Sequence, residues 1–344
     1  DRGMGAKMTV GVMNNGKIRR RPAWASPLIF GVIVIAVAVF SFMKNPSVTE
    51  AVMSAMIRFA VPLMLGALCG IYCERAGIVN IGIEGQMLLS AFTAYMTNVW
   101  TGNLILALLA GALTGALLGY FLAVISIKLK LNQIIGGTVI NILAIGITGF
   151  FYQVGMTTKG KFGPIRLGPL AKIPLVGPVL FNNPPITYIA FLMVIISHII
   201  FFHTRWGLRT RAVGEHPRAA DTLGIDVFKT RYLNTIIGGA LAGLAGAFLT
   251  LEGVGTFERN MTNGRGFIAL AVMIFGKWNP IGSALAALLF GLANALQTQL
   301  QFMGINIPHQ FIGMIPYALT IVVVSGFIGR SRSPAAEGTP YEKE

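Results

Sequence analysis

Residues 103–127 read NLILALLAGALTGALLGYFLAVISI, a stretch without any charged side chain. A helix that crosses a bilayer needs about 20 mainly apolar residues, because its backbone groups must be hydrogen-bonded within the segment where no water is available. This stretch meets both conditions and therefore predicts a transmembrane helix. Several other stretches of the chain do the same.

The composition of the whole chain agrees with this interpretation. Of its 344 residues, 54% are hydrophobic and 11% are charged, whereas a soluble domain carries about 25% charged residues. We therefore predict an all-α integral membrane protein. About ten segments are expected, at residues 27–43, 51–72, 79–100, 103–127, 132–153, 185–202, 232–252, 264–276, 280–299 and 308–328.

The basic residues indicate the topology. A formal charge of +15 would suggest nucleic-acid binding in a soluble protein, but here the basic residues cluster between apolar segments, where anionic lipid headgroups are sufficient partners and no nucleic acid is expected. Lys and Arg favour the cytoplasmic side. An even number of segments places both termini on one side, which is predicted to be cytoplasmic because it carries Arg19–Arg21, Lys128, Lys130, Arg330 and Arg332.

This topology divides the chain into a basic cytoplasmic tail (1–25), a transmembrane domain (26–330) and a second cytoplasmic tail (331–344). Residues 203–230 form a cytoplasmic loop. Residues 154–184 fall outside and, being rich in Gly and Pro, are expected to form a structured loop. The first segment follows three arginines as a signal peptide would, but residues 40–44 offer no small-residue cleavage site, so we expect it to be retained.

Two places do not resemble simple transmembrane helices. Residues 74–86 read ERAGIVNIGIEGQ, and residues 263–267 read NGRGF at the start of an unusually short segment. Glycines beside polar residues suggest broken or re-entrant helices, which are tolerated within a membrane only where the backbone lines a cavity or is buried in protein. Their occurrence in both halves suggests that a repeated unit places them against each other. The alternative is ordinary helix ends with small-residue packing.

Ionisable residues inside apolar segments are functional candidates, because their burial costs free energy unless they are paired with another charge or hydrated. Glu84 and Glu252 are such acids, and Arg58 and Arg265 are the matching cations. Glu84 is the preferred residue for a solute pathway. The alternative, which the sequence favours equally, is that Glu84 caps a helix N-terminus, where a carboxylate is favoured by about 0.3–1 kcal/mol.

Uncharged polar residues within the segments are the second group of candidates. Asn141 lies three residues beyond Thr138, and Gln297 three beyond Asn294, so each pair shares a helix face. Amides could line a route for a polar solute, or they could form hydrogen bonds between helices. The predicted pathway comprises Asn80, Glu84, Gln86, Asn141, Asn263, Phe267 and Asn294.

The sequence carries no signature of an enzyme. It lacks H-E-x-x-H, G-x-S-x-G and G-x-x-x-x-G-K-[ST], and its four histidines do not have the spacing of metal ligands. No catalytic residue, metal or bound cofactor is therefore expected in this chain. Cys69 and Cys73 share one helix face, but without further ligands nearby they are expected to be free, buried thiols.

The most informative stretch is GLRTRAVGEHPRAADTLGID, residues 207–226. Residues 218–223 can form a short helix after Pro217, with Gly224 as its stop. Such a helix is too short to be stable alone in water, so it needs a partner or the membrane protein beneath it. The alternative is an ordinary basic loop.

The pattern of Glu215, Ala219, Ala220 and Gly224 resembles the coupling-loop motif E-x-x-x-A-A-x-x-x-G of ABC importer permeases, in the form found in the branched-chain amino acid and simple-sugar permease family. Residues 74–85 are similar to the signature of its nucleoside-uptake branch. The resemblance covers residues 51–329.

This resemblance implies a type II-like importer permease in the bacterial plasma membrane that moves nucleosides by alternating access. The implied partners are a second homologous permease in a heterodimer, an ABC ATPase subunit that binds ATP and Mg²⁺, and an external substrate-binding lipoprotein. The residues implied to contact the ATPase are Glu215, Arg218, Ala219, Ala220 and Gly224. A ribose-like sugar permease is the first alternative, and a stand-alone secondary transporter is the second.

Overall fold

Long apolar helices dominate the computed structural model, which describes residues 43–153, 155–166, 168–302, 314 and 332–343. Six described helices are long and apolar enough to cross a membrane. They are α2 (Pro46–Glu74), α4 (Leu104–Ala123) continued by η1 (Val124–Lys128), α5 (Gln133–Phe151), α7 (Pro185–His203), α10 (Val227–Phe248) continued by η3 (Leu249–Gly253), and α12 (Pro280–Phe302). These helices agree with six predicted segments. The predicted segments 27–43 and 308–328 lie almost entirely outside the described residues.

The helix is interrupted at both places that the sequence singles out. After α2, residues 75–82 form turns and extended chain, and α3 (Ile83–Thr101) begins only at Ile83. After η3, non-helical chain leads to α11 (Arg265–Phe275), which has only 11 residues. The predicted segments 79–100 and 264–276 therefore correspond to helices that begin inside the bundle.

Polar residues define where several helices begin. The Asn103 side chain accepts hydrogen bonds from the N–H groups of Ile105 and Leu106 at the start of α4, and Asn132 caps α5 in the same way. Such caps satisfy backbone donors that have no partner within the helix. Asn132, the first residue of the fifth predicted segment, is thus the N-cap of α5.

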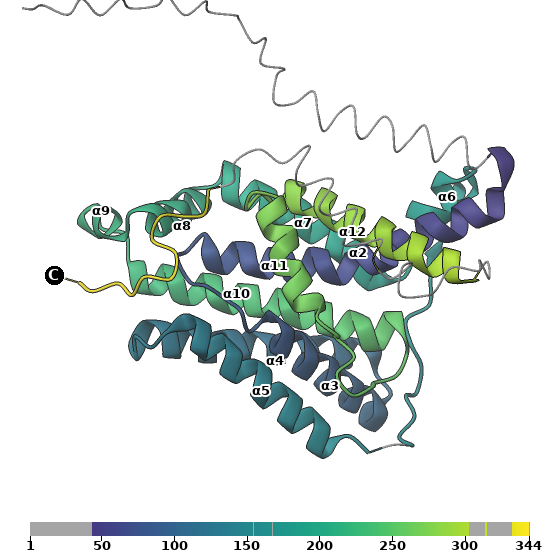
Figure 1. Cartoon of the computed structure of the whole chain (residues 1–344), viewed down its shortest axis with the longest axis horizontal. Coiled ribbons are helices and arrows are strands. Elements are labelled where there is room, and N and C mark those ends of the chain that lie inside the picture. The colour runs from purple at the N-terminus through teal and green to yellow at the C-terminus, as the bar shows by residue number, and fades with distance from the viewer. Residues whose placement is uncertain (1–42, 154, 167, 303–313, 315–331, 344) are drawn as a thin grey trace, which may run out of the picture.

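Two long connecting segments lie at opposite ends of the bundle (Figure 1). At one end, the 154–184 loop contains β1 (Ile165–Arg166), η2 (Gly168–Lys172), α6 (Val176–Leu180) and β2 (Asn182–Asn183), and β1 pairs antiparallel with β2. At the other end lie α8 (Arg205–Glu215), α9 (Pro217–Thr222) and residues 332–343.

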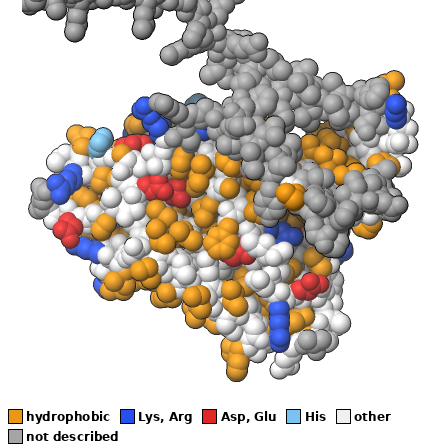
Figure 2. All heavy atoms as spheres, in the orientation of Figure 1, with side chains coloured by type: hydrophobic (Ala, Val, Ile, Leu, Met, Phe, Trp, Pro, Cys, Tyr) orange, Lys and Arg blue, Asp and Glu red, His pale blue; other side chains and the backbone are white. Residues whose placement is uncertain are grey.

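Helix α2 forms the centre of the bundle and packs against α10, α11 and α12. Almost every side chain from Ala60 to Glu74 is buried. By contrast, α4 and α5 expose large apolar residues such as Leu113 and Ile142, and Figure 2 shows apolar side chains spread over this region. An apolar outer surface suits a hydrocarbon environment.

Helices α4 and α10 are in contact along rows of small residues. A side chain on Gly115 would overlap the carbonyl oxygen of Gly239, and one on Gly119 would lie 2.5 Å from the carbonyl oxygen of Thr235. Small residues let helix backbones approach closely, and close packing is a main source of helix association in membranes. Glycine is therefore required at these positions for steric reasons.

We expect Gly115→Ala to destabilise the protein by about 1–3 kcal/mol, because the added methyl group separates α4 from α10. Gly146→Ala is the matched control, since a side chain on Gly146 of α5 meets nothing within 4 Å. The measurement is the Tm of each variant in detergent. Equal Tm values for the two variants would contradict the proposed contact between α4 and α10.

Candidate functional site

The two helix breaks meet at the side chain of Glu84, in the first turn of α3. Glu84 Oε1 accepts a hydrogen bond from the N–H of Gly264 at 2.8 Å, and Oε2 accepts one from the N–H of Gly266 at 2.6 Å. The first N–H groups of a helix lack partners within the helix and carry partial positive charge. The carboxylate of α3 therefore caps the N-terminus of α11.

This contact lies in the interior of the bundle. Glu84 is only 6% exposed, and a side chain on Gly266 would lie 2.5 Å from the Cα of Glu84. One turn further along α3, the carbonyl oxygen of Met87 packs against Gly246 of α10. The start of α3 is thus level with the middle of the long helix formed by α10 and η3.

Amides from α5 hold the chain between α2 and α3. The Asn141 side chain accepts from the N–H of Gly85 at 2.7 Å and donates to the carbonyl of Ile81 at 3.1 Å. Gln133 Oε1 accepts from the N–H of Val79 at 2.7 Å. These bonds satisfy backbone groups that regular helix would otherwise satisfy, so the interrupted chain can be buried without leaving them unpaired.

Asn80 and Gln86 are fully buried beside the two cysteines. Asn80 Nδ2 donates to Gln86 Oε1 at 3.1 Å and to Cys69 Sγ at 3.3 Å. Cys69 and Cys73 are free and buried, in agreement with the prediction for the thiols. Within the described part of the chain, Asn80 Oδ1 and Gln86 Nε2 have no hydrogen-bond partner.

The other predicted pathway residues are more accessible. Asn263 is exposed, with a left-handed φ of 43° just before α11, and Phe267 is 49% exposed on the first turn of that helix. On α12, Asn294 donates to the carbonyl of Phe290 in its own helix at 2.9 Å. The start of α11 thus brings Asn263 and Phe267 near Glu84, whereas the described bond of Asn294 is local.

A hollow of about 440 Å³ adjoins the chain that enters α11. Its lining is mostly polar, so it can accommodate water or a hydroxylated solute more readily than an apolar one. The lining residues are Leu249, Val254, Glu258, Arg259, Asn260, Met261, Asn263 and Arg265.

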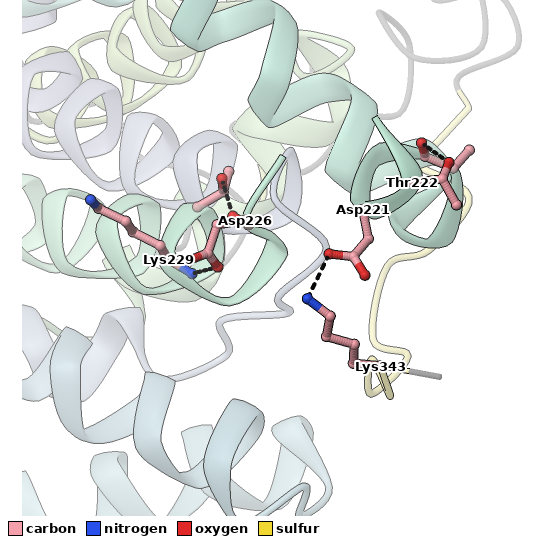
Figure 3. A network of polar contacts seen from close by, with 7 residues as sticks. Asp221, Thr222, Asp226, Lys229 and Lys343 are labelled. Atoms are coloured by element: carbon pink, nitrogen blue, oxygen red, sulfur yellow. Dashed lines mark hydrogen bonds and ion pairs between the residues drawn. The ribbon is translucent and has the colours of Figure 1, made fainter. Parts of the chain in front are cut away.

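The 207–226 stretch forms two helices rather than a simple basic loop. The predicted helix at 218–223 corresponds to α9, Pro217–Thr222. Gly224, with φ of +79°, follows it and donates its N–H to the carbonyl of Asp221 at 2.8 Å, as expected for a glycine stop. Figure 3 shows Asp221 and Thr222 on α9, with Asp226 capping the next helix, α10.

The faces of α9 differ in exposure. Ala220 is buried at 2% exposure, whereas Arg218, Ala219 and Gly224 are exposed, and Leu223 just after the helix is 81% exposed. Glu215, at the end of α8, accepts a hydrogen bond from the N–H of Ala335 at 3.2 Å. Four of the five predicted coupling residues are thus exposed and accessible to another protein, and the fifth, Ala220, is buried.

Arg75 links the first break to neighbouring elements. Its guanidinium donates two hydrogen bonds to the carbonyl of Trp278, between α11 and α12. Burial lowers the pKa of Arg75, the nearby charge of Arg211 lowers it further, and the carboxylate of Glu215 opposes both effects. The end of α8 is therefore electrostatically connected to the chain that precedes α3.

Sequence reasoning missed the role of Arg231 and did not assign one to Glu252. Arg231 is only 1% exposed and donates to the carbonyl of Thr339 at 3.0 Å. Glu252 accepts hydrogen bonds from the N–H of Ile186 at 2.9 Å and from the hydroxyl of Thr187, and so caps α7. The residues that pair with Arg231 and with Glu252 are distant from them in sequence. In addition, an arginine near the end of an apolar segment normally extends to water, so neither role could be seen from the sequence.

We expect Glu84→Gln to lower the free energy of unfolding by about 2 kcal/mol, because a neutral amide offers one acceptor oxygen instead of two and loses the charge-assisted bonds. Glu258→Gln is the matched control on an exposed residue, with an expected change of less than about 0.5 kcal/mol. Denaturant unfolding in detergent measures both. Equal stabilities would show that Glu84 does not hold α11.

Comparisons with known proteins identify the family. The chain is 40% identical to the guanosine ABC transporter permease protein NupQ of Bacillus subtilis, over 86% of this chain and 98% of that protein. It is 38% identical to the nucleoside ABC transporter permease protein NupC of Lactococcus lactis, over 86% of this chain and 97% of that one. For the putative glucose ABC transporter permease protein TsgC13 of Haloferax volcanii the identity is 35%, over 87% of this chain and 99% of the relative.

No solved structure matches the chain. The model of one protein family, described as the permease component of branched-chain amino acid transport systems, matches residues 52–324. The matched region contains both helix breaks and the α8–α9 segment, and it agrees with the resemblance noted from the sequence. This multi-pass membrane protein therefore belongs to the branched-chain amino acid transport system permease family of ABC transporters.

Proposed function

We propose that this protein is the permease subunit of a bacterial ABC importer that carries nucleosides across the plasma membrane. The observation that carries this proposal is its similarity, over almost their whole length, to relatives named for guanosine and nucleoside transport. ATP and Mg²⁺ would bind to a separate ATPase subunit. A second, homologous permease would complete a heterodimer, and an external lipoprotein would deliver the solute.

The basic end of the molecule supports the proposed topology. In this arrangement the α8–α9 end faces the cytoplasm, as its arginines favour, and the 154–184 loop faces outside. The remaining predicted segments would bring the total to about ten and place both termini in the cytoplasm. Anionic lipid would then contact the basic surface.

The α8–α9 segment supports the proposed route of coupling. Its exposed residues Arg218, Ala219 and Gly224 would contact a groove of the ATPase, with Glu215 and Ala220 fixing α9 from behind. Closure of the ATPase on ATP would move α9, and the two permeases would then switch the side to which their shared cavity opens.

For the solute pathway, we propose Glu84, Asn263 and Phe267 as the residues nearest the route, beside the polar hollow at the start of α11. Asn80, Gln86 and Asn141 would act mainly by holding the interrupted chain, since they are buried and bonded to it. Asn294 would lie on the α12 side of the route. Hydroxyls and base edges of a nucleoside suit such amide and carboxylate groups.

A sugar is the second candidate solute, because the relative TsgC13 is named as a putative glucose permease. Identity over this chain is lower for TsgC13 than for the two nucleoside permeases. Both candidates share a ring that bears hydroxyl groups, so a polar hollow alone does not separate them.

Uptake of radiolabelled guanosine, adenosine, ribose and glucose into proteoliposomes tests the function. We expect nucleoside uptake only when this chain is reconstituted with its ATPase, sister permease and binding lipoprotein, and only with ATP on the ATPase side. The control replaces ATP with a non-hydrolysable analogue. Uptake by this chain alone would make it a secondary transporter, and preferential uptake of ribose or glucose would favour the sugar alternative.

We expect Leu223→Asp to lower co-purification of the ATPase about tenfold or more, because an exposed apolar residue that enters a groove would be replaced by a charge. Ile165→Asp, which changes a 45% exposed residue of β1 in the 154–184 loop, should leave co-purification unchanged. Equal recovery of the ATPase with both variants would exclude this surface as its docking site.

A further inference from the structure

Residues 332–343, here named the C-terminal strap, run between α8 and α10, as the yellow segment in Figure 1 shows. Besides the bond from the N–H of Ala335 to Glu215, three hydrogen bonds of the strap backbone define its course. The N–H of Ala336 donates to the carbonyl of Gly214 at 2.9 Å, and the N–H of Gly338 donates to the carbonyl of Gly77 at 3.2 Å. The carbonyl of Thr339 accepts from Arg231 at 3.0 Å. The strap therefore touches α8, the break between α2 and α3, and α10.

The strap is also held by buried apolar side chains. Tyr341 is 6% exposed, and its ring centroid lies 5.4 Å from that of Phe228 on α10. It belongs to a small core that includes Val213 of α8, Ala220 of α9 and Val227 of α10. Tyr341 therefore joins the strap to the apolar side chains of α8, α9 and α10.

Two ion pairs lie at the edges of the strap. Lys343 contacts Asp221 of α9 at 3.5 Å (Figure 3), and Glu342 contacts Lys130, between η1 and α5, at 2.6 Å. The hydrogen bond between Glu342 and Lys130, together with the attraction between their charges, lowers the pKa of Glu342. Exposed ion pairs contribute little to stability, so these pairs orient the strap and the buried contacts retain it.

Arg231 connects the strap to the interior of the protein. A buried guanidinium is costly unless it is hydrogen-bonded, and the carbonyl of Thr339 accepts from Nη1, whereas Nε and Nη2 have no hydrogen-bond partner among the described residues. At Gly77, with φ of +88°, a side chain would lie 2.8 Å from Arg231 Nη2 and 3.2 Å from the carbonyl oxygen of Ala336. Arg231, the α2–α3 break and the strap are thus in direct contact, without space for one more carbon atom.

Helix α9 rests on this assembly. Its buried residue Ala220 belongs to the same small apolar core as Tyr341 of the strap and Val227 of α10. Arg218 and Ala219 are exposed, and they border a hollow of about 680 Å³ whose other wall is formed by the strap. Helix α9 is therefore connected to the rest of the described structure through α8, through α10 and through the strap, and the strap also reaches the break between α2 and α3.

We propose that the C-terminal strap transmits the movement of α9 to the break between α2 and α3, with Tyr341 and Ala336 as positioning residues. This inference rests on the proposed function, in which α9 docks to an ATPase. Loss of the strap would leave ATP hydrolysis running while less solute crosses for each ATP consumed.

The test compares Ala336→Leu with Ala335→Leu in the fully reconstituted transporter. The two residues are adjacent, but Ala336 is 7% exposed and packed, whereas Ala335 is exposed. Overpacking at Ala336 should lower the population of the docked strap about tenfold. We expect the number of guanosine molecules taken up per ATP hydrolysed to fall by a similar factor for Ala336→Leu and to remain at the wild-type value for Ala335→Leu.

A covalent rescue separates transmission from a general loss of stability. In the Ala336→Leu background, Asp221→Cys and Lys343→Cys joined by a short bismaleimide attach the strap to α9 again, and the uptake per ATP should recover. A chain truncated after residue 331 should show the uncoupled ratio without recovery.

The outcomes also separate this inference from the importer function. If the wild-type transporter takes up no solute with ATP, the proposed function itself fails. If the wild type is coupled and both Ala336→Leu and the truncated chain keep its ratio, only the strap proposal is overturned. It is equally overturned if neither variant assembles with the ATPase, because the strap would then serve assembly rather than transmission.

Discussion

The carboxylate of Glu84 at the N-terminus of α11 is the interaction on which the arrangement of the two breaks depends. A helix that begins inside a bundle presents several N–H groups to a space where water is scarce, and each unpaired group costs free energy comparable to a lost hydrogen bond. Glu84 supplies both acceptor atoms at once. Because Glu84 belongs to the other interrupted helix, the two breaks stabilise each other.

The same requirement explains the amides around α3. Asn141 and Gln133 satisfy backbone groups of the interrupted chain from α5, and Glu252 performs the corresponding task for α7. These three polar side chains therefore lie where a regular helix begins or ends. A protein that keeps irregular backbone near its centre needs such partners, and irregular backbone provides exposed carbonyls and N–H groups for a passing solute.

Much of this architecture could be predicted from the sequence, because apolar length and glycine placement are local signals. The runs around residues 103–127 and 185–202 correspond closely to helices, and the glycines near Asn80 and Asn263 correctly indicated interruptions. The sequence left two interpretations of Glu84 open, a helix cap and a residue of the solute pathway. Glu84 caps a helix, but the helix is α11 rather than its own, and only the fold brings residues 84 and 264 together.

The contacts of residues 332–343 could not have been foreseen. Their composition is that of a polar tail, and their partners Gly77, Gly214 and Arg231 all lie at least 108 residues away in the sequence. Arg231 likewise resembles an ordinary arginine near the end of an apolar segment until its burial is known. Local patterns carry no information about such pairings, because the binding energy comes from surfaces that exist only after the helices have packed.

The length of α2 has a consequence for the surrounding bilayer. Its 29 residues extend about 44 Å at 1.5 Å per residue, whereas a typical hydrocarbon core is about 30 Å thick. The half that ends at Glu74 is encased by other helices, so the excess length must be accommodated by tilt or by the half near Pro46, where side chains are more exposed. Membrane thickness therefore acts on the central helix mainly from the Pro46 side, and lipids of different chain length should change its inclination.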